Sequence, residues 1–157
     1  MSKYDYDVVV VGGGAAGLTC SGICASFGAK TGLIEKHRLG GDCTWSGCVP
    51  SKALLHIAKR VSSMTTAGHL GITVSDIAVD FGQVMKSVRQ TRQNIYEEAD
   101  SPEVMQARGV EILTGSAVFE DDHSIQITDA NGSKSASFRS AIITAGGSPI
   151  SLPIPGL

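Results

Sequence analysis

Apolar and polar positions near the amino terminus predict a strand, a helix and a second strand. Residues 6–11 form a β-branched apolar run, which is typical of a parallel strand buried on both faces. The run stops at three glycines, and residues 15–27 then place small and apolar side chains at helical offsets, with Gly28 positioned to end the helix. Residues 30–35 form another apolar strand. The pattern therefore predicts a right-handed βαβ unit with parallel strands.

Helical patterns continue through the middle of the chain, and strand patterns return after it. Residues 49–64 have helical composition, a capping pattern at residues 80–83 precedes a long amphipathic stretch, and residues 101–109 form a further short helix. The strands expected after it span residues 110–119, 124–128 and 137–145, with a turn at Asn131-Gly132. The expected fold class is α/β, with a parallel central sheet, flanking helices and a small antiparallel β meander near the C-terminal end.

Composition narrows the class of protein. With 157 residues, 42% of them hydrophobic and 18% charged, the chain is expected to build one soluble globular core. No apolar stretch is long enough for a membrane span, and a net charge of -2 lacks the basic excess of a nucleic-acid binder. The amino terminus has no signal-peptide pattern, so we expect a cytoplasmic protein without nucleic-acid or membrane partners. In that compartment the four cysteines are expected to be reactive or buried rather than a disulfide framework.

The first glycine cluster has the spacing of a dinucleotide-binding loop. Gly12-x-Gly14-x-x-Gly17 follows a predicted strand and opens a predicted helix, whose free N–H groups and dipole favour a diphosphate. Glu35 ends the next strand, where its carboxylate can accept hydrogen bonds from a ribose 2′-hydroxyl and repels a 2′-phosphate. The alternative is a purely structural glycine turn. The absence of a Gly-Lys-Ser/Thr sequence excludes a nucleoside-triphosphate P-loop.

Two cysteines five positions apart form the most specific segment. Five residues of regular helix span about 7.5 Å, which exceeds the Cα separation of roughly 4.4 to 6.8 Å in disulfides, so Cys43 is expected on non-ideal backbone. Cys48 lies near a predicted helix start, which favours its thiolate, and Lys52 lies one turn further along. Two alternatives are inert buried thiols and a zinc site that includes His37 or His56. Cys20 and Cys24 are expected to pack in the core.

These motifs together resemble the amino-terminal segment of the class I pyridine nucleotide-disulfide oxidoreductases. The resemblance also includes Gly115-Ser116-Ala117 and residues 142–146, and it implies a Rossmann-like FAD-binding domain with FAD as cofactor and NAD(P)H as co-substrate. By the resemblance, Cys43 exchanges with substrate, Cys48 lies under the flavin, and Lys52 approaches the flavin N5 region. The implied catalytic residues are Cys43 and Cys48, no metal is implied, and the implied cofactor-binding residues are Gly12, Gly14, Ala16, Gly17, Glu35, Lys36, Gly41, Asp42, Lys52, Ala117, Ala145 and Gly146.

Departures from the family pattern refine the expectation. Asp42 and Trp45 replace the usual Thr and Asn around the first cysteine, and Thr144-Ala145-Gly146 replaces the commoner Ala-Thr-Gly. The sequence Asp42-Cys43-Thr44-Trp45 is most similar to that of the mercuric-reductase-like branch. The alternatives are an enzyme of the dihydrolipoamide dehydrogenase type and a non-catalytic dinucleotide-binding module with inert cysteines.

The resemblance also implies a domain organisation and partners. Family members are about three times as long, so residues 1–147 are expected to be the first segment of the FAD-binding domain, and residues 148–157 a connection toward an NAD(P)H-binding domain. The implied substrate is a small-molecule disulfide or mercuric ion, and the full-length protein is expected to be a homodimer. The 157-residue chain alone is expected to be inactive, because it contains neither a hydride-donor site nor the family's general base.

Overall fold

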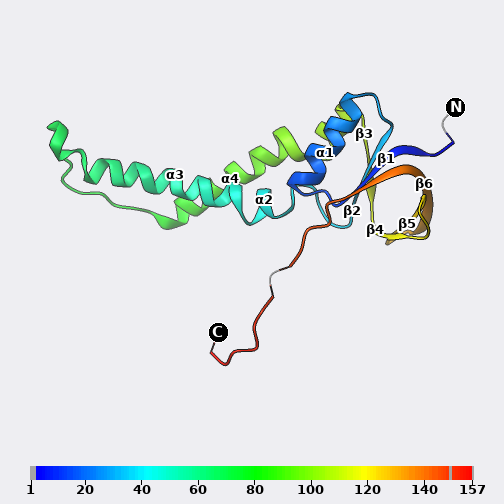
Figure 1. Cartoon of the computed structure of the whole chain (residues 1–157). Coiled ribbons are helices and arrows are strands. Elements are labelled where there is room, and N and C mark those ends of the chain that lie inside the picture. The colour runs from blue at the N-terminus through cyan, green and yellow to red at the C-terminus, as the bar shows by residue number, and fades with distance from the viewer. Residues whose placement is uncertain (1–2, 149, 157) are drawn as a thin grey trace.

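A mixed six-stranded sheet forms the centre of the protein. The computed structural model describes residues 3–148 and 150–156 (Figure 1). The strands lie in the order β3-β2-β1-β6-β5-β4, with β1, β2, β3 and part of β6 parallel and β4, β5 and the rest of β6 antiparallel. Their bounds are β1 Tyr6–Val11, β2 Thr31–Glu35, β3 Val110–Thr114, β4 Ser116–Phe119, β5 Ser124–Asp129 and β6 Gly132–Ile143. The predicted α/β class with a β meander is confirmed.

Strand β6 joins the parallel sheet to the meander. Its first half pairs antiparallel with β5, from Gly132 opposite Asp129 to Ser137 opposite Ser124. Its second half pairs parallel with β1, beginning with Phe138 opposite Tyr6. One long strand therefore belongs to both parts of the sheet, and its carboxyl end arrives beside the end of β1 (Figure 1).

The helices follow the predicted pattern with one addition. Their bounds are α1 Ala15–Ser26, α2 Gly41–Trp45, α3 Cys48–Thr65, the 3₁₀ segment η1 Ala67–Leu70, α4 Phe81–Ile95, the π-helical segment η2 Tyr96–Asp100 and α5 Pro102–Ala107. The expected helix starts are confirmed by side-chain caps: the Asp80 carboxylate accepts from the Gln83 N–H at 3.0 Å, and the Ser101 hydroxyl accepts from the Val104 N–H. Helix α2 was not expected.

Each face of the parallel sheet is covered by its own hydrophobic cluster. On one face Val10 and Leu33 pack with Leu18 of α1 and Met105 of α5. The other cluster joins the parallel strands to the meander, and its buried residues are Tyr6, Val9, Ile34, Leu113, Ile125, Ile127, Ala136 and Phe138. Val9 and Val10 are both fully buried, which confirms that β1 is covered on both faces.

The strand prediction is wrong in three places. The strand expected to begin at residue 137 begins at Gly132, as β6. Residues 110–119 form two strands, not one, because the chain turns at Gly115, which has a φ of +145°. A Cβ at Gly115 would lie 2.8 Å from the Thr128 carbonyl oxygen, so the turn brings the chain close to the end of β5. The last strand ends at Ile143, so Thr144 and Ala145 lie beyond it.

Helices α3 and α4 form an arm that projects from the sheet (Figure 1). They pack on each other, but α3 has no buried residue and α4 buries only Val88. Among the helices of residues 3–148 and 150–156, none has both the length and the apolar character needed to cross a membrane. The start of α3, which follows α2, lies at the end of the arm nearer the sheet (Figure 1).

Substituting two glycines of α1 tests the packing of this helix on β1. A Cβ at Gly17 would lie 1.8 Å from the Gly12 carbonyl oxygen, whereas a Cβ at Gly22 would meet only the Met105 Cε, at 3.9 Å. We expect Gly17→Ala to lower the free energy of unfolding by at least about 2 kcal/mol, because the backbone must move. The matched Gly22→Ala should raise it by about 0.5–1 kcal/mol through the helix propensity of alanine. Equal effects in urea denaturation would contradict this packing.

Candidate functional site

The loop between β1 and α1 is held by close backbone contacts at two of its glycines and is open at a third. A Cβ at Gly17 would lie 1.8 Å from the Gly12 carbonyl oxygen, and a Cβ at Gly12 would meet the Thr144 carbonyl oxygen, so neither position has room for a side chain. At Gly14, by contrast, an added Cβ would meet only the Gly41 Cα, at 3.9 Å. Gly14 has extended backbone, with φ −79° and ψ −172°, so neither conformation nor protein packing requires a glycine there. The space in front of Gly14 is therefore available to a ligand.

Glu35 binds the loop from the end of β2. One carboxylate oxygen accepts from the Gly13 N–H at 2.7 Å, and the other accepts from the His37 N–H at 2.8 Å. The half-buried carboxylate is thereby oriented at the start of α1, which is where the sequence predicts a ribose. Each oxygen keeps a further lone pair, so both can accept a second hydrogen bond.

Thr144 fastens the same loop from the end of β6. Its hydroxyl donates to the carbonyl oxygens of Gly12, at 2.9 Å, and Val11, at 3.1 Å, and its N–H donates to Val11 at 2.8 Å. From sequence, the order Thr144-Ala145 predicts only the loss of a hydroxyl from the cofactor site. In the structure this hydroxyl holds the glycine loop instead.

A second glycine pair brings the cysteine segment to the loop. The Gly40 N–H donates to the Gly13 carbonyl oxygen at 2.9 Å, and Gly40 forms a parallel bridge with Gly14. Gly41 has a φ of +56°, and a Cβ there would lie 2.7 Å from the Gly14 Cα. The two glycine segments therefore touch through backbone alone, and α2 starts directly at this contact.

The two cysteines lie on separate helices that meet at a break. Cys43 is in the five-residue helix α2, and Cys48 is the first residue of α3. Between them the Gly47 N–H donates to the Asp42 carbonyl oxygen at 2.6 Å. The prediction that Cys43 lies on non-ideal backbone is wrong: Cys43 is helical, and the irregular backbone that separates the two helices lies at residues 46–47. The break brings the two thiols together.

Contact between the cysteines changes the acidity of one of them. Hydrogen bonding of the Cys43 thiol with Cys48 raises the pKa of Cys43, and burial and the charge of Cys48 add to this effect. Lys52 lowers the pKa of Cys43 and Asp100 raises it, both through charge. Both cysteines are free thiols; Cys43 is half-buried and Cys48 is exposed. Cys43 therefore retains its proton to higher pH than an isolated cysteine does.

Trp45 attaches α2 to the residues before it and to the segment formed by α4 and η2. Its indole N–H donates to the Leu39 carbonyl oxygen at 2.7 Å, and its ring lies 3.5 Å from the Arg38 guanidinium carbon. Arg92 of α4 donates to the Trp45 carbonyl oxygen at 3.1 Å, and the Tyr96 ring packs at 5.0 Å. Trp45 thus anchors α2 to α4 and η2, a role that its position in the sequence did not indicate.

The Cys43 side of the site opens into a cavity of about 270 Å³. Its walls come from α1, α2, the start of α3, and the segment from the end of α4 to α5. The Thr44 hydroxyl, next to Cys43, donates to the Asp100 carboxylate at 2.5 Å. The cavity is lined by Ala15, Leu18, Thr19, Cys43, Thr44, Val49, Ile95, Ala99, Asp100 and Arg108. A small molecule in this cavity would meet Cys43.

The remaining predicted cofactor-binding residues differ in their exposure and in their contacts with the glycine loop. Ala145 follows Thr144 and lies against Gly12, and the exposed Gly146 comes next with a φ of +69°. Ala117 is half-buried in β4, just after Gly115, whose N–H donates to the Glu35 carbonyl oxygen at 2.9 Å. The side chains of Ala16, Lys36, Asp42 and Lys52 are exposed.

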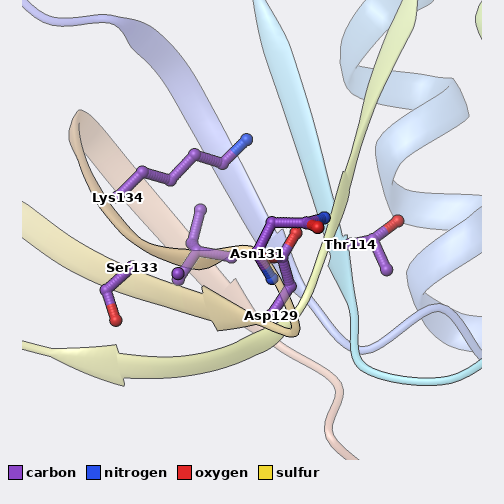
Figure 2. Close-up of a pocket in the computed structure, with 7 residues that line it drawn as sticks. Thr114, Asp129, Asn131, Ser133 and Lys134 are labelled. Carbon is purple, nitrogen blue, oxygen red and sulfur yellow. The ribbon is translucent and has the colours of Figure 1, made fainter.

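A further cavity lies at the β5–β6 hairpin and is separate from these residues. It has a volume of about 230 Å³ and is lined by Thr114, Ile127, Asp129, Asn131, Gly132, Ser133 and Lys134 (Figure 2). None of the four cysteines or the predicted site residues lines it. In the described part of the chain, no three or more His, Cys, Asp or Glu side chains gather as metal ligands would, the cysteine pair with His37 or His56 included.

Comparison with known proteins agrees with this arrangement. The dihydrolipoyl dehydrogenase of Bacillus subtilis (strain 168) is 31% identical over 147 residues, covering 94% of this chain and 31% of the relative. The dihydrolipoyl dehydrogenase of Buchnera aphidicola subsp. Acyrthosiphon pisum is 34% identical over 157 residues, covering 98% of this chain and 32% of the relative. The chain thus spans about a third of the length of these curated relatives.

The sequence profile of one family matches almost the whole chain. It covers residues 6–157, and so includes the glycine loop, Glu35 and both cysteines of the α2–α3 break. This match implies FAD and NAD(P)H as cofactors. The chain belongs to the pyridine nucleotide-disulphide oxidoreductase family.

Proposed function

We propose that this chain carries the flavin-facing redox centre of an FAD-dependent disulfide oxidoreductase. Electrons pass from NAD(P)H through FAD to a Cys43–Cys48 disulfide and then to a substrate. The observation that carries the proposal is the contact of the Cys43 and Cys48 thiols on two successive helices, the first of which, α2, starts at the glycine loop. The chain's own share of this activity is cofactor binding and dithiol exchange, and the hydride-donor site belongs to the longer protein.

The residues present fit FAD. The open space in front of Gly14 accommodates a diphosphate that approaches the backbone at the start of α1, where free N–H groups and the helix dipole favour negative charge. Glu35 is already oriented there and can accept from ribose hydroxyls. When bound, FAD supplies the two-electron relay between the nicotinamide and the disulfide.

The two thiols divide the chemistry between them. Cys43 lines the cavity, which supports exchange with substrate at this thiol, whereas Cys48 at the start of α3 is exposed and is proposed to face the flavin. Oxidation of the pair forms one S–S bond and releases two protons and two electrons to the oxidant. Exchange needs the Cys43 thiolate, and the raised pKa of Cys43 means that a base is needed to remove its proton at neutral pH.

The relatives favour a small dithiol or disulfide as substrate. Those compared above are named dihydrolipoyl dehydrogenases, which supports a dihydrolipoamide-type substrate over the mercuric ion that the Asp42-Cys43-Thr44-Trp45 sequence favours. We further propose that the longer protein is a cytoplasmic homodimer. Its rate with dihydrolipoamide, compared with that for mercuric ion, distinguishes the two branches; faster turnover of mercuric ion would contradict the substrate proposed here.

Disulfide formation tests whether the thiols work as a pair. In a Cys20→Ser/Cys24→Ser chain only Cys43 and Cys48 remain. We expect stoichiometric diamide, which accepts two electrons, to remove both titratable thiols while the chain stays monomeric on non-reducing gels. The same chain with an added Cys43→Ser change should retain its single thiol or form only intermolecular dimers. Two thiols surviving oxidation would show an inert pair, as in a non-catalytic binding module.

Alkylation as a function of pH tests the contact between the thiols. Because Cys48 raises the pKa of Cys43, Cys48→Ala should move the midpoint of Cys43 alkylation by iodoacetamide to lower pH. Mass spectrometry of the modified peptides follows each cysteine separately. Cys20→Ala is the matched control, and it should leave the Cys43 midpoint in place. A midpoint that rises or does not move in Cys48→Ala would contradict the contact.

A further inference from the structure

Asp100 is tied to the redox helix by a hydrogen bond across the cavity. Thr44 is buried, with 3% of its surface exposed, and its hydroxyl donates to the Asp100 carboxylate at 2.5 Å. Thr44 adjoins Cys43 on α2, whereas Asp100 is the last residue of η2, so the bond joins segments 56 residues apart. Asp100 and Cys43 line the same cavity. The carboxylate is therefore fixed on the substrate side of Cys43.

The charged groups around Cys43 come from two packed segments. From α3, Cys48 and Lys52 act on it with opposite signs, and from η2 Asp100 raises the pKa of Cys43 through charge. A third segment adds a cation: Arg108, the residue after α5, lines the cavity, and one of its guanidinium N–H groups points to the Met105 sulfur at 3.9 Å. The part of α1 that lines the cavity, Ala15, Leu18 and Thr19, contributes no titratable group.

We propose that Asp100, held by Thr44, is a positioning and specificity residue that places a fixed negative charge beside Cys43 and disfavours anionic substrates there. The inference rests on the proposed function, in which Cys43 is the thiol that meets substrate. A carboxylate a short distance from the reacting sulfur repels a second negative charge in the cavity and does not repel a neutral one. The site is therefore suited to neutral disulfides and dithiols, such as an amide-linked dithiol, rather than to disulfides that carry several carboxylates.

Two alkylating reagents that differ in charge test this selectivity on the reduced chain. Iodoacetamide is neutral and iodoacetate is an anion, and the thiolate displaces iodide from both as it forms the C–S bond. Fragment-ion mass spectrometry gives the rate of each reagent at Cys43. We expect Asp100→Asn, which keeps a hydrogen-bond acceptor for Thr44, to lower the iodoacetamide-to-iodoacetate rate ratio at Cys43 by about threefold to tenfold. The midpoint of Cys43 alkylation should move to lower pH in the same variant.

Matched variants separate the charge from the position of Asp100. Glu98→Gln removes a negative charge from the same segment, η2, but from a residue that does not line the cavity, so the rate ratio should stay at the wild-type value. Thr44→Ser keeps the hydroxyl donor and should behave as wild type. Thr44→Val releases the carboxylate and should move the ratio in the direction of Asp100→Asn. The ratios at Cys20 and Cys24 report on overall folding and should not change.

Two results would overturn the inference. One is an unchanged ratio and midpoint at Cys43 in Asp100→Asn, and the other is a change of the same size in Glu98→Gln. Wild-type behaviour of Thr44→Val would remove the positioning role of Thr44. These outcomes are independent of disulfide formation by Cys43 and Cys48, so failure of this inference is distinguishable from failure of the proposed redox function.

Discussion

A backbone contact between two pairs of glycines organises the whole site. The Gly40 N–H donates to the Gly13 carbonyl oxygen at 2.9 Å, and Gly41 approaches Gly14 so closely that a Cβ would lie 2.7 Å from the Gly14 Cα. A side chain at Gly41 would force the two segments apart, and one at Gly13 would collide with the Leu39 side chain, 2.5 Å away. The contact places the helix with Cys43 next to the loop that the sequence predicts to bind a diphosphate. Cys43 and the predicted cofactor loop are neighbours for this reason.

Other interactions hold the two sides of the contact in place. Thr144 holds the glycine loop from the end of β6, and the Glu35 carboxylate holds it from the end of β2. On the other side, Trp45 and Thr44 attach α2 to the distant segment that contains α4 and η2. The same attachments introduce charge, because Asp100 comes with the Thr44 bond. Anchoring and electrostatic control of Cys43 therefore have one structural origin.

The part of this arrangement that depends on local pattern could be predicted from the sequence. The βαβ unit and the caps at Asp80 and Ser101 follow from short-range periodicity and residue chemistry. Helix α2 could not be predicted, because it has only five residues and begins at a left-handed Gly41 that tertiary contact requires. The turn at Gly115 was missed because a single glycine in an apolar run gives no sign of what will pack against it.

Long-range pairs account for the other omissions. Thr44 and Asp100 are 56 residues apart, and Arg92 donates to the backbone of Trp45 across 47 residues. Periodicity carries no information about such partners. The contact of the Thr144 hydroxyl with Gly12 is a further long-range pair. The sequence order Thr144-Ala145 shows a departure from the family pattern, but it does not indicate that this hydroxyl donates to the Gly12 carbonyl oxygen.

The most direct test of the account is a two-electron reductive titration of the FAD-loaded protein, followed by absorbance at long wavelength. The account places the sulfur of Cys48 against the flavin, so the wild type should develop a charge-transfer band and Cys48→Ser should lack it. The matched Cys20→Ser protein should keep the band. A band that persists in Cys48→Ser at wild-type intensity would show that another group faces the flavin, and would contradict the arrangement derived from the glycine contact.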